Sequence, residues 1–283
     1  MLSNLLNNKY MKRLRISLNP SLVTPIIIFQ PGKVGSMSVQ RSLEEAYKHP
    51  DLDMPIIIHH VHALNQLDER EGYVRKTRKN PEESIQLIQE WRILRKEIES
   101  NPFKKWNVVN LVRDPVAIKV SALFQLLDQH IPDWEKRLNT NELAMADLEE
   151  LFFGKQEFGF HGLDRWYDNQ IKALWGIDIF ASPFPWGRGY QIFKKENINL
   201  IIIRLEDLNR VAEQAFDEFL GLKNFKVVNA NIGKEKPYAE LYNEFKKHPL
   251  PVDYIDQGYG SRFANHFYTR DEIAAFRKHW ARQ

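Results

Sequence analysis

Short, uninterrupted runs of branched apolar residues are the feature that most limits how this chain can fold. Such runs are typical of strands buried on both faces of a sheet, and they occur at 25–30, 54–58, 106–112 and 200–205. Helical periodicity predicts helices between and after them, at 38–48, 82–100, 116–128 and 163–174. Because strands alternate with helices, we expect an α/β fold of three layers, P-loop-like, with a central parallel sheet flanked by helices.

The composition agrees with a folded globular chain. Of 283 residues, 43% are hydrophobic and 27% are charged, which is ordinary usage for globular proteins and excludes disordered and fibrous classes. No repeat, low-complexity tract or linker composition divides the sequence. We therefore expect residues 1–283 to form a single domain, with an N-terminal extension at 1–24 and a C-terminal helical region at 209–283.

Several classes of protein are disfavoured by what the sequence lacks. No apolar run reaches the roughly 18 residues of a membrane span, and no signal-peptide pattern is present at the start. There is no cysteine, so disulfides, thiolate metal sites and a cysteine nucleophile are excluded. A net charge of +3 does not indicate a nucleic-acid partner. We expect a cytoplasmic protein with a preference for anionic ligands.

A strand, a glycine turn and a helix follow one another at 26–39. The turn 30–38 has the sequence Gln-Pro-Gly-Lys-Val-Gly-Ser-Met-Ser, which would present backbone N–H groups at a helix start, where anions bind. Lys33 adds a cation, while Ser36 and Ser38 add hydroxyl donors. It is not a Walker A loop, because the lysine precedes the second glycine. The alternative is an ordinary turn in which a serine caps the helix.

A second segment places an arginine at the end of a predicted strand. Asp114 and Pro115 suit the N-cap and first position of a helix, so Arg113 would stand at the carboxyl edge of the sheet, where ligands of α/β proteins bind. The alternatives are a salt bridge for Arg113 and an uninvolved helical serine at Ser121.

Together the two segments resemble the nucleotide motifs of the sulfotransferase superfamily. The later strand that ends in Glu-Asp-Leu at 206–208 also resembles that family, and a bacterial group of capsular polysaccharide synthesis proteins extends the likeness toward the C-terminus. The resemblance implies that 3′-phosphoadenosine 5′-phosphosulfate (PAPS) is the donor. Its implied contacts are Lys33, Gly35, Ser36, Met37 and Ser38 for the phosphosulfate, and Arg113 and Ser121 for the 3′-phosphate. Met37 departs from the family, which usually has a hydroxyl residue there.

Three histidines follow the predicted strand at 54–58. Transfer to a hydroxyl needs a base, and imidazole titrates near neutral pH, so His60 or His62 is our candidate, with His59 in a packing role. The alternatives are a zinc site built on a His-x-His pair, which lacks a third ligand with convincing spacing, and histidines that only hydrogen-bond at a strand end. Glu206 or Asp164 would be the next candidate base.

The resemblance implies transfer of a sulfuryl group to a hydroxyl, and we expect the acceptor to be a carbohydrate. Lys33 would stabilise the leaving phosphate oxygen, and no metal is required. Two alternatives remain open: a nucleotide or small-molecule kinase, and a nucleotide-binding scaffold without turnover. Trp186 and Arg188, in the loop predicted at 180–190, are candidate acceptor contacts. Residues 258–262 predict a turn, which would either close over the nucleotide or simply connect helices.

Overall fold

The computed structural model describes residues 24–48, 56–155, 159–228 and 236–281. Its centre is a five-stranded sheet in the order β2-β1-β3-β5-β4. The first four strands run parallel, and β4 runs antiparallel to β5 at the edge. Their bounds are β1 (Ile26–Phe29), β2 (Ile58–Val61), β3 (Trp106–Val112), β4 (Tyr190–Lys195) and β5 (Ile198–Arg204). The predicted α/β class with a mainly parallel central sheet is confirmed.

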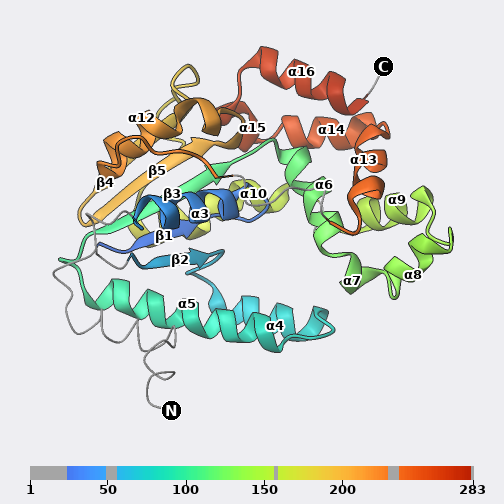
Figure 1. The fold of residues 1–283 in the computed structure, drawn as a ribbon, viewed down its shortest axis with the longest axis horizontal. Coiled ribbons are helices and arrows are strands. Elements are labelled where there is room, and N and C mark those ends of the chain that lie inside the picture. The colour runs from blue at the N-terminus through green and yellow to red at the C-terminus, as the bar shows by residue number, and fades with distance from the viewer. Residues whose placement is uncertain (1–23, 49–55, 156–158, 229–235, 282–283) are drawn as a thin grey trace.

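Helices cover the sheet and extend beyond one end of it. A pair of helices, α4 (Leu67–Thr77) and α5 (Glu82–Ser100), lies along the β2 side, and α12 (Leu208–Leu220) lies along the β4 side (Figure 1). The C-terminal helices lie beside α6 to α9, on the right-hand side of the view (Figure 1). The remaining helices are α3 (Ser36–Ala46), α6 (Pro115–Gln125), α7 (Leu127–His130), α8 (Trp134–Asn139), α9 (Met145–Gly154), α10 (His161–Trp166), α11 (Ala173–Trp175), α13 (Ala239–Lys247), α14 (Val252–Tyr259), α15 (Arg262–Phe267) and α16 (Arg270–Ala281).

The strands form where branched residues are buried on both faces. Every residue of β1 is fully buried, and β3 and β5 are buried along nearly their whole length. Burying a Val, Leu or Ile side chain is worth about 1.5–3 kcal/mol, so these three strands anchor the core. Within the described residues, no helix is both long enough and apolar enough to cross a membrane.

The second strand is displaced from its predicted position. The prediction ended it at Ile58, whereas β2 begins there and runs through His59 and His60 to Val61. Parallel pairing with β1 sets this register, since Ile26 stands opposite Ile58 and Phe29 opposite Val61. As an edge strand with partly exposed faces, β2 tolerates the two histidines. The earlier part of the predicted strand, up to residue 55, lies outside the described residues.

Three further predictions needed correction. Residue Tyr190 begins β4, an edge strand that the sequence analysis did not predict. Residues 163–174 are helical but change from α10 to a π-helical segment, Tyr167–Lys172, and then to α11. Residues 258–262 are not a single turn, because they end α14 and begin α15, and only Gly260 and Ser261 connect the two.

Candidate functional site

The loop between β1 and α3 has the backbone conformation of a phosphate-binding turn. Gly32, Lys33 and Gly35 have positive φ angles of 101°, 61° and 82°. A Cβ on Gly35 would lie 2.6 Å from Cδ1 of Leu205, so only glycine permits this close approach. Gly35 is also the N-cap of α3 and has no side chain to cap the first turn. The N-terminal N–H groups of this 11-residue helix are therefore well placed to bind an anion.

The two predicted nucleotide segments meet at this loop. Arg113 lies directly after β3, and its Nη1 donates a hydrogen bond of 3.0 Å to the backbone oxygen of Lys33. Lys236, from the segment before α13, is close enough to affect the charge on Lys33. Burial, Arg113 and Lys236 together lower the pKa of Lys33 to about 8. Among the described residues, none of the three cations forms an ion pair with a carboxylate.

The turn that carries Arg113 is held in place by residues from distant parts of the chain. Asp114 caps α6 by accepting from the backbone N–H of Val116 at 2.9 Å, and Pro115 occupies the first helical position as predicted. The other bonds to the Asp114 carboxylate come from Tyr259 Oη at 2.7 Å and Trp280 Nε1 at 2.9 Å. The C-terminal helices α14 and α16 therefore fix the start of α6, and with it the position of Arg113.

Two acidic residues considered as substitute bases have structural roles instead. Glu206 accepts from the backbone N–H of Asp114 at 2.8 Å and from Tyr268 Oη at 3.1 Å, and burial raises the pKa of its carboxyl. Asp164 accepts the backbone N–H groups of Arg262 and Phe263 at the start of α15. Both carboxylates are thus engaged in holding helices.

His60 in β2 and His62 directly after it lie beside the glycine turn, and both contact Gln30, the residue that follows β1. His62 Nδ1 is 2.9 Å from the backbone oxygen of Gln30. Because a carbonyl oxygen only accepts, Nδ1 carries the proton, and the lone pair of His62 is on Nε2. His60 Nε2 faces the amide nitrogen of Gln30 at 3.4 Å. The ring of His62 also lies close to Gly32, because a Cβ added at that glycine would be in van der Waals contact with Cε1, at 3.7 Å.

Burial keeps both imidazoles neutral at physiological pH. It lowers the pKa of His60 to about 4, with a further contribution from His62. Burial also lowers the pKa of His62, against the effect of its hydrogen bond to Gln30, and the charges of Arg70 and Lys33 lower it further. A neutral imidazole with a free Nε2 can accept a proton. The structure therefore gives His62 the protonation state of a base.

The segment after β2 is fixed by the π-helical region. Trp166 Nε1 donates to the backbone oxygen of His62 at 2.9 Å, and Gln170 Oε1 accepts from the backbone N–H groups of Leu64 and Asn65, both at 2.9 Å. The end of β1 is fixed in a similar way, since Asn110 Nδ2 donates to the Phe29 oxygen at 2.6 Å. π-Helical turns are frequent at functional sites, and through Gln170 this one holds Leu64 and Asn65, just after His62.

The remaining predicted residues lie at varying distances from this centre. Ser36 and Ser38 are in the first turn of α3, and Met37 between them is 37% exposed. Ser121 is in the second turn of α6, where its partly buried hydroxyl forms no hydrogen bond with a described residue. His59 is in β2, opposite Ile27.

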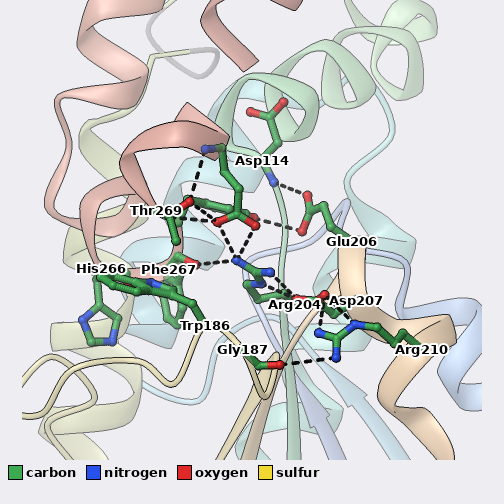
Figure 2. A network of polar contacts seen from close by, with 12 residues as sticks. Asp114, Trp186, Gly187, Arg204, Glu206, Asp207, Arg210, His266, Phe267 and Thr269 are labelled. Carbon is green, nitrogen blue, oxygen red and sulfur yellow. Dashed lines mark hydrogen bonds and ion pairs between the residues drawn. The ribbon is translucent and has the colours of Figure 1, made fainter. Parts of the chain in front are cut away.

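The predicted acceptor contacts, Trp186 and Arg188, each bond to other parts of the chain. Figure 2 shows Arg204 surrounded by oxygen atoms, including the Phe267 carbonyl at 3.2 Å and the Glu272 carboxylate at 2.9 Å. Trp186 donates to the His266 carbonyl at 3.0 Å beside this network (Figure 2). Arg188 pairs with Glu218 and Tyr190. Both predicted contact residues are therefore engaged with other parts of the chain.

Sequence reasoning missed three members of the site. Gln30 has a buried Oε1 without a hydrogen-bond partner among the described residues, and its position directly after β1 was the available signal. Lys236 and Arg70 come from segments without any motif, so only the folded chain brings them near Lys33 and His62. No group of three or more His, Asp or Glu side chains within the described ranges is arranged to hold a metal ion.

Comparison with known proteins finds a family model that matches part of the chain. The family model NKWYS, described as "Putative capsular polysaccharide synthesis protein", matches residues 139–269. That stretch contains Trp166, Gln170 and Glu206, which position the residues around the glycine turn, but it does not contain Lys33 or Arg113. No curated protein and no solved structure matches the chain. Over these residues the chain is similar to a family linked by name to capsular polysaccharide synthesis, as the sequence comparison anticipated.

Proposed function

We propose that this protein transfers a sulfuryl group from PAPS to a hydroxyl group of a carbohydrate acceptor. The observation that carries the proposal is the contact between the two motif segments, in which Arg113 bonds to the Lys33 backbone beside an uncapped helix start. Cations without carboxylate partners are costly unless an anion completes the site. The cations at this site, Lys33, Arg113 and Lys236, fit a ligand with two separate phosphate groups, which PAPS has.

Each group at the site has a role in this proposal. The N–H groups at the start of α3 and the ammonium of Lys33 would bind the 5′-phosphosulfate, and Arg113 would bind the 3′-phosphate with charge-assisted hydrogen bonds. PAPS supplies an activated sulfuryl group on a phosphate leaving group. His62 would accept the proton of the acceptor hydroxyl at Nε2, while the Gln30 carbonyl holds its ring in the required tautomer. Of the two candidate bases, this geometry favours His62.

The carbohydrate acceptor rests on the family match. The name of the matching model refers to polysaccharide synthesis, and its residues include those that hold the segment carrying His62. A sulfotransferase that modifies a capsular or related glycan would combine the matched family with the two nucleotide segments.

Thermal unfolding with nucleotides tests the donor part. A ligand that binds only the folded state stabilises it by RT ln(1 + [L]/Kd), so 3′-phosphoadenosine 5′-phosphate at 100 times its Kd should add about 2.7 kcal/mol. The stabilisation should not require Mg²⁺. Equal stabilisation by ATP, or a strict requirement for Mg²⁺, would favour a kinase instead. Transfer of labelled sulfate from PAPS into a panel of glycans then separates an enzyme from a scaffold that only binds nucleotide.

A further inference from the structure

A group of arginines without acidic partners extends from the candidate base onto helix α4. The guanidinium of Arg70 stacks over the ring of Trp91, with Cζ 5.3 Å from its centroid. The ring of His62 meets the same indole edge to face, at 6.0 Å between centroids and 90° between planes. Trp91 is itself buried, so it forms a rigid base on which Arg70 and His62 are held near each other.

Neighbouring arginines on this helical pair differ in having acidic partners. Arg75 pairs with Glu71 at 2.6 Å, and Arg92 pairs with Glu71 and Asp68, both at 2.5 Å. Arg70 forms no ion pair with any described residue, and the pKa of its guanidinium is lowered by burial and then by the charge of another arginine, Arg78.

Arg78 is also without a carboxylate partner in the described part of the chain. Because the like charges of Arg70 and Arg78 repel each other, their proximity does not stabilise the folded chain. A guanidinium held over an indole, and without an ion-pair partner among the described residues, can bind a carboxylate through two parallel hydrogen bonds.

We infer that the acceptor is an acidic saccharide, whose carboxylate binds Arg70 and Arg78 while the hydroxyl to be modified lies at His62. This inference rests on the proposed function, because it uses His62 as the base of that reaction. A saccharide is favoured over a nucleic acid because the family match names polysaccharide synthesis and the net charge of +3 does not indicate a nucleic-acid partner. Tyr73 is 51% exposed and lies close enough to Arg70 to affect the pKa of its guanidinium. Its ring adds an aromatic surface suited to a sugar ring.

Binding measurements on the full chain, without donor, test the inference. The probes are an oligosaccharide of uronic acids and the same oligosaccharide with its carboxyl groups reduced to alcohols. We expect the acidic form to bind at least about tenfold more tightly, with the difference shrinking at high salt, as for any exposed charge pair. Arg70→Gln should abolish the preference while leaving the weak binding of the reduced form unchanged, and Arg70→Lys should retain part of it. Arg78→Gln should reduce it independently.

Arg75→Gln is the matched control, because it removes a cation of the same helix that already has an acidic partner. It should leave the preference intact. Equal affinity of the wild type for both oligosaccharides would overturn the inference, as would tighter binding of a single-stranded oligonucleotide that also depends on Arg70. Nucleotide stabilisation in the thermal assay is independent of these outcomes. A protein that binds 3′-phosphoadenosine 5′-phosphate but shows no preference would retain the proposed function and lose only the acidic acceptor.

Discussion

Two clusters of cationic side chains in this molecule have opposite surroundings. Around Arg204, every charge is balanced: the guanidinium bonds to Asp207, to Glu272 and to the Phe267 carbonyl, and Arg210 pairs with Asp207 in turn (Figure 2). Around Lys33, the charges that affect its pKa are other cations, and among the described residues Arg113 donates only to the backbone oxygen of Lys33.

The difference separates a structural cluster from a candidate binding site. Arg204 is only 4% exposed, so its charge needs the neighbouring carboxylates to be tolerated. The Lys33 cluster lies at the carboxyl edge of the sheet without such compensation from any described residue, and burial, together with the neighbouring cations, lowers the pKa of Lys33. An anionic ligand would supply the missing charge. The stability of the first cluster and the ligand affinity of the second should therefore respond differently to mutation.

The largest effect is expected from the compensated cluster. Arg204→Met would leave Asp207 and Glu272 without their common cation, which should cost about 3–5 kcal/mol in the free energy of unfolding. Arg113→Met is the control for an arginine without an acidic partner, and it should cost less than about 1 kcal/mol. Urea denaturation of both variants measures this. Equal destabilisation by the two substitutions would remove the distinction between the clusters.

The next effect concerns the neutral histidines beside the uncompensated cluster. His62→Ala should lower kcat at least about 100-fold, because it removes the general base, and should change the affinity for nucleotide by less than about threefold. His60→Ala should retain most of the turnover. In the wild type the acid limb of kcat/KM should lie below the ordinary histidine pKa of 6.5, since burial lowers the pKa of both imidazoles. An acid limb near pH 7, or normal turnover in both variants, would contradict the assignment.

Arg113 is expected to distinguish two nucleotides. Arg113→Ala should weaken binding of 3′-phosphoadenosine 5′-phosphate about 30-fold, through loss of charge-assisted hydrogen bonds, and adenosine 5′-phosphate much less. Ser121→Ala should act in the same direction more mildly. Calorimetric titration of the two ligands measures the difference. If both ligands lose affinity equally, Arg113 supports the loop through its bond to the Lys33 backbone and does not bind the 3′-phosphate.

Local sequence signals predicted one part of this site well. β3 has the predicted bounds, and Asp114 and Pro115 occupy the predicted cap positions, because apolar runs and helix caps are local properties. The position of β2 could not be obtained this way, since pairing with β1 sets its register. The segment after β2 is likewise held by long-range bonds, from Trp166 at the end of α10 and from Gln170 in the π-helical turn.

Charge compensation was the other property hidden from the sequence. On the helical pair of α4 and α5 the fold pairs Arg75 and Arg92 with acids, whereas Arg70 has no acidic partner among the described residues. Lys236 is 203 positions from Lys33 in the sequence and affects its charge only in the folded chain. Which cations are paired is decided by tertiary contacts, and no motif records it.

The smallest predicted effect is on Lys33, and it has the sign opposite to that of most mutations. Its pKa of about 8 in the folded protein is below the ordinary value of 10.5, so its charge is disfavoured by folding. The unfolded chain therefore binds more protons between pH 8 and 10.5, and stability should rise with pH across that window, whereas below pH 8 the cost is constant. Lys33→Met should consequently stabilise the protein by about 1 kcal/mol at pH 7 and flatten the rise. The positive φ at this position is equally unfavourable for lysine and methionine, so it does not affect the comparison.

Lys48→Met, at an exposed lysine paired with Glu45, is the control and should show neither change. Urea denaturation at pH 7, 8, 9 and 10 measures the slopes, and the same variant should lose nucleotide binding. A destabilised Lys33→Met protein would mean that the ammonium already has a favourable environment, and the cluster would then need no anionic ligand.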